Sequence, residues 1–177
     1  YQNPTRIHFG KKAINKLANE LREYGKNILL VYGKASIKKI GLYDQVMNIL
    51  QAEGKTVVEL AGINANPRYT QLLEGARLVR EHNIDLILAV GGGSVIDCAK
   101  GIACAAYAEG DVWQRYYVNQ EPVTNRVVPV GSILTMAGTG SEMNSGSVIT
   151  NEAENLKIGR VYPLALVTPR FSILNPE

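Results

Sequence analysis

The stretch of this sequence with the clearest chemical potential is Gly91–Ser94, three glycines and a serine. Glycines without side chains let the backbone approach a ligand closely. The helix expected after them would offer unpaired N–H groups and the positive end of its dipole to an anion. We therefore expect a phosphate or pyrophosphate site. The competing interpretation is a tight turn with no ligand, since neither G-x-G-x-x-G nor G-x-x-x-x-G-K-[ST] occurs in the chain.

A second loop of small residues runs from Thr135 to Ser141. Ser94 with Asp97, and Thr139 with Glu142, both fit the Ser/Thr-x-x-acid pattern of a capping box, which predicts a helix start at each loop. In a parallel sheet, loops at the carboxyl ends of strands lie on one rim. The two loops are therefore expected to face the same ligand.

Groups that could carry out a reaction are scarce in this chain. Its two histidines, His8 and His82, are far apart in sequence, and no HExxH, CxxC or G-x-S-x-G motif is present. Cys98 and Cys104 fall six positions apart on one predicted helix, which points them in different directions and excludes a disulfide between them. We predict a binding site without catalytic or metal-ligating residues of its own.

The strands and helices that would position these loops are predicted from hydrophobic periodicity. Short apolar runs that predict buried strands alternate with stretches of apolar residues at helical spacing. This alternation predicts an α/β fold, a doubly wound, Rossmann-like parallel sheet with helices on both faces. The predicted strands cover residues 5–10, 27–32, 56–60 and 85–90, and the predicted helices cover residues 13–21, 42–50, 72–79 and 95–106.

The regular alternation of predicted strands and helices ends after Ala108. A short helical turn is expected over residues 111–117, and a strand over 126–131, where Pro129 suggests an edge or irregular position. Residues 147–150 and 156–159 predict a small antiparallel hairpin. Two short terminal strands are expected over residues 165–167 and 171–174.

At the other end of the chain, residues 5–10 alternate between apolar and polar side chains, which predicts a strand with one buried face.

Composition restricts the classes of function. The chain has 177 residues, 46% of them hydrophobic and 20% charged, with a formal net charge of +3, which fits a globular domain. No block of basic residues favours nucleic acid, no apolar run reaches the roughly 18 residues of a membrane span, and no signal peptide opens the chain. We expect a cytoplasmic protein. The absence of an initial methionine suggests a piece of a longer chain.

Several motifs, in order along the chain, resemble the cofactor-binding N-terminal domain of the iron-containing (group III) alcohol dehydrogenases. This domain has a dehydroquinate synthase-like fold, and the closest resemblance is to the butanol dehydrogenase and aldehyde reductase type. The resemblance implies that residues 1–177 form one dinucleotide-binding domain. The matching stretches are residues 3–6, 9–10, 32–34, 36–39, 66–68, 89–97, 138–144 and 147–151.

The resemblance also implies a role for individual residues in binding a nicotinamide dinucleotide. Backbone N–H groups and a hydroxyl would hold the pyrophosphate, and other side chains would contact the phosphate, ribose and nicotinamide groups. Asp97 could instead be only a cap, and Lys157 only a solvated strand residue. The implied assignments are Gly92, Gly93 and Ser94 to the pyrophosphate, Thr135 and Thr139 to the phosphate and nicotinamide side, Asn144 and Lys157 to the nicotinamide ribose, Asp97 to the nicotinamide ring, and Asn66 to the adenosine half.

The choice of cofactor is predicted from the end of the second strand. Members of the family with Asp at this position favour NAD, whereas this chain has Gly33, which leaves room for a 2′-phosphate. Ser36 and the lysines at 34, 38 and 39 follow, so we expect NADP(H) in preference to NAD(H), with Gly33, Ser36 and Lys39 in the site. The alternative is that these lysines only cap and solubilise the helix.

In this family the metal, Fe(II) or Zn(II), is held by a helical C-terminal domain, which the resemblance places beyond Glu177. The full-length protein would act on a small alcohol or aldehyde as a homodimer, while this chain alone would bind cofactor without activity. Two alternatives stay open: the nucleotide-binding half of a glycerol dehydrogenase or dehydroquinate synthase-like enzyme, and a nucleotide-binding module that is not an enzyme.

Overall fold

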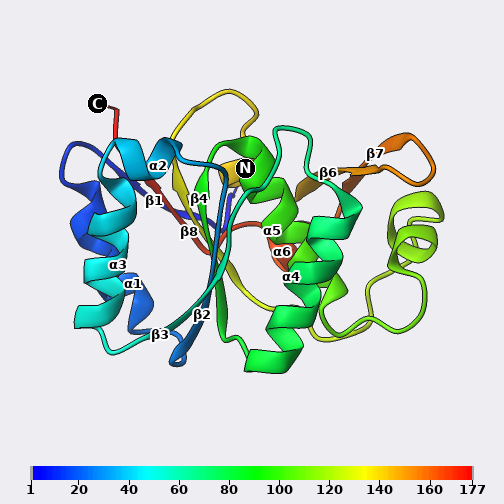
Figure 1. Ribbon diagram of the computed structural model, residues 1–177, viewed down its shortest axis with the longest axis horizontal. Coiled ribbons are helices and arrows are strands. Elements are labelled where there is room, and N and C mark those ends of the chain that lie inside the picture. Colours follow the sequence, from blue (N-terminus) through cyan, green and yellow to red (C-terminus); the bar gives the residue numbers. More distant parts are fainter. Residues whose placement is uncertain (1, 177) are drawn as a thin grey trace.

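The computed structural model describes residues 2–176, which form a six-stranded sheet covered by helices on both faces (Figure 1). All neighbouring strands of this sheet run parallel, in the order β1–β8–β5–β4–β2–β3. The predicted doubly wound α/β fold is confirmed. The strands are β1 (Arg6–Phe9), β2 (Asn27–Tyr32), β3 (Thr56–Leu60), β4 (Leu86–Gly91), β5 (Val130–Leu134) and β8 (Phe171–Leu174).

Strand β4 is the centre of the sheet and is buried along its whole length. It pairs with β2 on one side and β5 on the other, so that Ala89 lies between Val31 and Ser132. A strand with apolar residues on both faces is stable only when helices cover both. This burial explains why the sequence before the glycines is apolar without alternation.

The helices divide between the two faces, as Figure 1 shows. On one face lie α1, α2 and α3; on the other lie α4 and α5. Each face has its own apolar core, one around Leu30 and Leu88, the other around Ala89 and Ile96. The helices are η1 (Ala13–Lys16), α1 (Leu17–Leu21), α2 (Ser36–Lys39), α3 (Leu42–Ala52), α4 (Tyr69–His82) and α5 (Gly93–Ala105).

An outer layer lies beyond α4 and α5, made of the short helix η2 (Trp113–Val118) and the antiparallel hairpin β6 (Gly146–Asn151) and β7 (Leu156–Val161) (Figure 1). The Trp113 ring stacks on Tyr117, with ring centroids 5.4 Å apart. The predicted hairpin and the predicted helical turn are both confirmed. No helix in residues 2–176 is long and apolar enough to span a bilayer.

Two expectations about the second half of the chain are wrong. Residues 165–167 lie in the short helix α6 (Leu164–Val167), where the Leu166 N–H donates to Pro163 O; an apolar run this short fits a helix as well as a strand. The strand expected over residues 126–131 begins only at Val130, so the irregular position of Pro129 is confirmed, whereas the edge position is wrong because β5 lies inside the sheet. The Pro129 carbonyl accepts from the Ile87 N–H at 3.0 Å, and its missing N–H costs no ladder bond inside β5.

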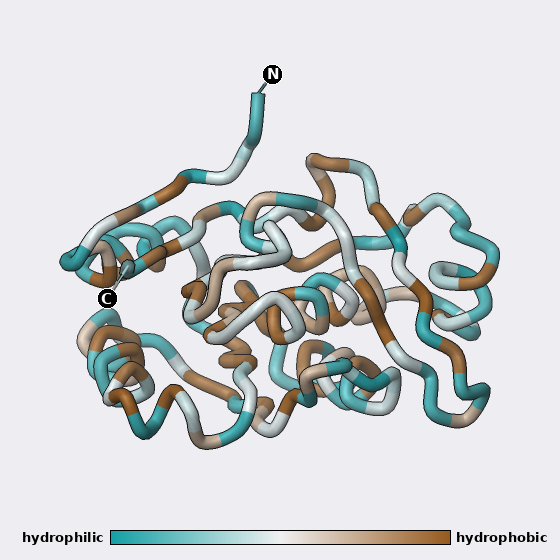
Figure 2. Tube along the Cα trace, turned by 90° about the horizontal axis from the view of Figure 1, so that it is seen from above, coloured by the Kyte–Doolittle hydropathy of each residue, from teal (hydrophilic) through white to brown (hydrophobic). Residues whose placement is uncertain are grey.

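Strand β1 forms where expected, but its predicted buried face is wrong. The Phe9 side chain is 71% exposed and Ile7 is 39% exposed. β1 is an edge strand that pairs with β8 alone, and the stretch leading into it runs along one side of the molecule (Figure 2). A side chain on an edge strand is buried only if a helix reaches that far, and α1 contacts β1 through polar groups, Arg6 and His8 with Glu20.

Candidate functional site

The carboxyl ends of β2, β4 and β5 lie side by side, since the three strands are neighbours in the sheet. The chain winds outward from β2 to β3, then returns to place β4 on the other side of β2. Crevices for ligands form at such topological switch points, at the carboxyl ends of the strands. A cavity of about 400 Å³ lies here, lined by the loops after β2, β3, β4 and β5.

The glycine turn forms one wall of this cavity. Helix α5 begins at Gly93, after Gly92 with φ −87° and ψ −171°. A Cβ on Gly92 would meet only Met136, at 4.0 Å, so the turn leaves open space where a ligand could approach. The N–H groups of Gly93 and Ser94 have no carbonyl four residues back inside the helix and remain as donors for an anion.

Both predicted capping boxes are wrong. Ser94 Oγ donates to Ala65 O, in the loop after β3, and Asp97 accepts from Ser141 Oγ at 2.5 Å and the Val148 N–H at 3.0 Å. Thr139 Oγ1 accepts from the Ser141 N–H at 3.3 Å, without the return contact from Glu142 that a capping box requires. Ser94 and Asp97 therefore join segments that are distant in sequence, while Thr139 makes a local turn.

Six of the residues predicted to bind cofactor line the cavity at the switch point. The glycine turn supplies three, the loop after β2 supplies two, and the loop after β5 supplies one. Their gathering from three separate loops confirms that the two small-residue loops share one rim. The six are Gly33, Ser36, Gly92, Gly93, Ser94 and Thr139, and Lys34, Asn64, Ala65, Met136 and Gly138 also line this cavity.

An adjoining cavity of about 670 Å³ shares four lining residues with the first, Lys34, Ile63, Asn64 and Ala65. Asn66 lines it, and Lys157, on β7, donates from Nζ to Asn66 Oδ1 at 2.8 Å. The Lys157 ammonium group therefore lies next to a residue of this second cavity, where it would place a positive charge near a bound phosphate or ribose. The two cavities together form an extended crevice.

The corner near Gly33 is less basic than the sequence suggested. Lys34 and Ser36 line the crevice, but the Lys38 ammonium lies 4.8 Å from the Tyr43 ring centroid and 5.7 Å from that of Tyr32. This cation–π contact holds Lys38 away from the crevice. Lys39 is exposed on α2 and is not among the residues that line it.

Thr135 lies further along the same rim. Its N–H donates to Gly91 O at 3.0 Å, and it lines a separate cavity of about 400 Å³. That cavity is mainly apolar, with Ile14, Ile40 and Leu42 among its lining residues. An apolar group would fit among these side chains, and Lys11 adds a charged residue to the lining.

Asp97 and Asn144 do not line the crevice but belong to a polar network centred on Lys100, which sequence reasoning missed. Lys100 Nζ donates to Ser141 Oγ at 2.8 Å, Asn144 Oδ1 at 3.0 Å and Gly146 O at 3.1 Å. Burial lowers the pKa of Lys100 to about 8, and burial also raises that of Asp97. The signal was available: position 100 is a lysine within an otherwise apolar stretch of helix.

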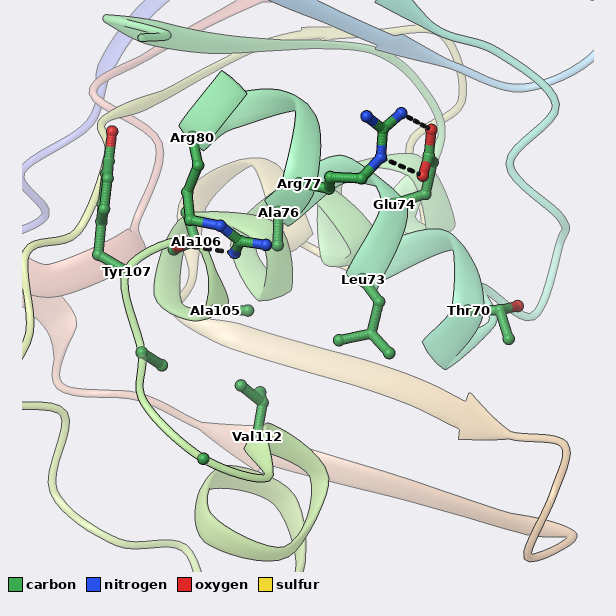
Figure 3. Close-up of a pocket in the computed structure, with 12 residues that line it drawn as sticks. Thr70, Leu73, Glu74, Ala76, Arg77, Arg80, Ala105, Ala106, Tyr107 and Val112 are labelled. Carbon is green, nitrogen blue, oxygen red and sulfur yellow. Dashed lines mark hydrogen bonds and ion pairs between the residues drawn. The ribbon is translucent and has the colours of Figure 1, made fainter. Parts of the chain in front are cut away.

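Another cavity, of about 680 Å³, lies between α4 and the chain that follows α5 (Figure 3). Its cationic side chains already have partners: Arg77 with Glu74 and Glu81, and Arg80 with Ala106 O at 2.9 Å. It lies at the carboxyl end of α5, remote from the glycine turn. This cavity lacks converging groups that could select a ligand.

Within residues 2–176, no three His, Cys, Asp or Glu side chains lie close enough together to hold a metal ion. Cys98 and Cys104 are both free and buried, and burial raises the pKa of each thiol to about 12. Such thiols are poor nucleophiles and poor ligands. The described residues therefore offer a binding crevice and no metal centre.

A parallel sheet with a crevice over a glycine turn at its switch point is an arrangement found in many nucleotide-binding α/β domains. The model of the family described as iron-containing alcohol dehydrogenase matches residues 4–176. The chain belongs to this family. The resemblance seen in the sequence is thereby confirmed.

Relatives in this family differ in the cofactor that their names state. The chain is 52% identical, over 99% of its length, to probable NADH-dependent butanol dehydrogenase 1 of Bacillus subtilis, and 41% identical, over 98%, to the NADPH-dependent aldehyde reductase YqhD of Escherichia coli. The crystal structure of NADH-dependent butanol dehydrogenase A from Thermotoga maritima superposes with a TM-score of 0.91 at 38% identity, over 99% of this chain and 44% of that one. The chain spans 44% of the length of both curated relatives.

Proposed function

We propose that this chain is the cofactor-binding half of a metal-dependent alcohol dehydrogenase, which transfers hydride between a nicotinamide dinucleotide and a small primary alcohol or aldehyde. The supporting observation is the crevice at the switch point, with the N–H groups of Gly93 and Ser94 at its wall. Family membership favours this reading over a glycerol dehydrogenase or dehydroquinate synthase-like enzyme. The names of the relatives favour it over a module that is not an enzyme.

The residues of the crevice fit a dinucleotide. The first turn of α5 would accept the pyrophosphate, because free N–H groups and the helix dipole both favour an anion. Lys157 and Asn66 would bind a ribose in the adjoining cavity, and Thr139 would close the crevice from the opposite loop. When bound, the nicotinamide supplies the hydride-transferring carbon.

The proposed enzyme also needs a metal site. No cluster within residues 2–176 fits Fe(II) or Zn(II), so the described residues do not hold it. We propose that the metal ligands and most of the substrate pocket belong to a segment outside residues 2–176. The chain alone would then bind cofactor and have no dehydrogenase activity. A homodimer and a cytoplasmic location stay predictions.

We further propose NADP(H) over NAD(H), by at least tenfold. A Cβ at Gly33 would meet nothing nearer than Ile63 O at 3.6 Å, so the corner is open, and Lys34 and Ser36 line it. A charge-assisted hydrogen bond to a 2′-phosphate contributes about 1.5–3 kcal/mol, and 1.4 kcal/mol is a factor of ten. With Lys38 held on two tyrosine rings, Lys34 is the cation best placed to contribute.

Calorimetric titration of the purified chain with NADPH and NADH tests both proposals. We expect saturable binding of each dinucleotide, with NADPH at least tenfold tighter. Equal or tighter binding of NADH would refute the choice of cofactor and leave the site intact. Binding of ADP with no contribution from the nicotinamide half would favour a simple nucleotide-binding module.

A further inference from the structure

Lys100 is a charged residue at the centre of the fold. It lies in the middle of α5, and its side chain is fully buried. A buried ammonium group is costly unless hydrogen bonds replace its water. All three donors of Lys100 Nζ have acceptors, in Ser141 Oγ, Asn144 Oδ1 and Gly146 O, so the group is satisfied as an ammonium ion.

These three acceptors come from one segment, residues 139–146, which includes the short helix η3 (Ser141–Met143) and leads into β6. Asp97, one turn earlier on α5, holds the same segment through Ser141 Oγ, and holds β6 through the Val148 N–H. Ser141 therefore donates to Asp97 and accepts from Lys100. Ser172 Oγ donates to Glu142 O at 2.7 Å and the Tyr162 N–H donates to Ser145 O at 3.1 Å. The hydrogen bonds to this segment from α5 itself come from Asp97 and Lys100.

The far end of the segment forms part of the crevice. Asn144 Nδ2 approaches Thr139 O at 3.5 Å, and Thr139 Oγ1 lies where a Cβ on Gly93 would come to within 2.3 Å. Thr139 thus packs directly on the glycine turn. A displacement of residues 141–146 would move Thr139 relative to the N–H groups of Gly93 and Ser94.

We propose that Lys100 is a positioning residue for the dinucleotide, holding residues 139–146 against α5 so that Thr139 and the glycine turn face the same ligand. This inference rests on the proposed function. Lys100 lines neither cavity of the crevice, so it would not contact a ligand bound there. It acts through Ser141 and Asn144, which distinguishes it from the residues of the crevice.

The charge state of Lys100 supplies a readout that a purely structural residue would lack. The groups that act on its charge are Asp97 on α5 and Glu142 on η3, both of which oppose the lowering of its pKa to about 8. Cys98 and Tyr117, the nearby thiol and phenol, stay neutral at this pH because burial raises the pKa of each. A bound 2′-phosphate, with a pKa of about 6, is already almost fully ionised over this pH range. Loss of the Lys100 proton near pH 8 weakens its hold on the segment.

The experiment measures the dissociation constant of NADPH between pH 7 and pH 9 for the 177-residue chain and for Lys100→Met, which keeps the length of the side chain and removes its donors. The control is Ile102→Val, a buried change on the same helix. We expect Lys100→Met to weaken NADPH binding at pH 7 by tenfold or more and to remove the pH dependence, while the control keeps both.

Wild-type affinity should fall severalfold between pH 7 and pH 9. An unchanged dissociation constant in folded Lys100→Met would overturn this inference and leave the proposed function standing, whereas absence of NADPH binding to the wild-type chain would overturn both. If Lys100→Met does not fold, the wild-type pH profile decides, because a flat profile contradicts the positioning role. Ser141→Ala should reduce the pH dependence by removing one acceptor of Lys100.

Discussion

Lys157 Nζ donates a hydrogen bond of 2.8 Å to Asn66 Oδ1, joining the outer hairpin to the loop after β3. The sequence resemblance placed Lys157 at the nicotinamide ribose and Asn66 at the adenosine half. Two residues in direct contact would bind the same part of an extended dinucleotide, so the two assignments now compete. Both residues adjoin the crevice through the cavity that Asn66 lines, on the side facing the hairpin.

We predict that the pair binds the nicotinamide half. Lys157→Met should weaken NADPH binding about tenfold, the loss of one charge-assisted hydrogen bond, and Asn66→Ala should do the same. Neither variant should change the affinity for 2′-phospho-ADP, which lacks the nicotinamide half. Competition titrations check this, and a loss of 2′-phospho-ADP affinity in either variant would place the pair at the adenosine end.

Gly33→Asp should reverse the choice of cofactor. The space beside Gly33 admits a side chain, and its backbone lies outside the left-handed region, so the variant should fold. A carboxylate there would repel a 2′-phosphate and accept the ribose hydroxyls of NAD. We expect NADPH to bind at least tenfold more weakly and NADH more tightly. Gly33→Asn, of the same size without the charge, is the control and should show a smaller change.

Substitutions in the glycine turn should separate binding from stability. Gly92 has a negative φ and open space beside it, so Gly92→Val should keep the fold and lose NADPH binding. Gly93→Ala would press its Cβ on Thr139 Oγ1, with only 2.3 Å between them, and should lower the melting temperature as well. Thermal unfolding beside calorimetry tests the contrast. Normal NADPH affinity in a folded Gly92→Val chain would show that the phosphate binds at another site.

Much of the fold was predictable because the sequence pattern is local. The apolar run of β4 and the apolar stripe of α5 each indicate which residues of that element are buried. The placement of both small-residue loops on one rim followed from the parallel sheet. Edge position and short elements were not predictable: the exposure of Phe9 depends on how far α1 reaches, and residues 165–167 carry no periodicity long enough to distinguish helix from strand.

The site was harder to predict, because its polar side chains act over long distances in sequence. Ser94 and Asp97 fit a local capping pattern, yet their partners are Ala65, Ser141 and Val148. The sequence suggests Lys38 as a phosphate ligand, whereas in the structure its ammonium group lies over the Tyr43 ring. Spacing along one helix cannot reveal such partners, since they come from other strands and loops.

The chain alone should oxidise no alcohol. Its described residues hold no metal cluster, and the Lewis acid that polarises the alcohol oxygen would be absent. Purified chain with NADP⁺, butan-1-ol and added Fe(II) or Zn(II) should show no formation of NADPH at 340 nm. Turnover that depends on added metal, in a preparation free of other dehydrogenases, would contradict the assignment of the metal site to another segment.

Lys100 should also leave a signature in the pH dependence of stability. Burial lowers its pKa from 10.5 to about 8, so between these two values the unfolded chain holds a proton that the folded chain has released. The free energy of unfolding therefore carries a penalty from Lys100 that is full below pH 8 and disappears as the pH rises to 10.5. Each pKa unit corresponds to about 1.4 kcal/mol, so the full penalty is about 3 kcal/mol.

Lys100→Met lacks this penalty at every pH, while the acceptors it leaves without a donor cost the same at every pH. Denaturant unfolding of both chains should therefore show the difference in stability moving in favour of wild type by about 2.5 kcal/mol between pH 7 and pH 10. The comparison cancels the titration of the buried thiols and phenols, which both chains share. A constant difference would mean that Lys100 titrates alike in the folded and unfolded chain, and that its ammonium group is not desolvated.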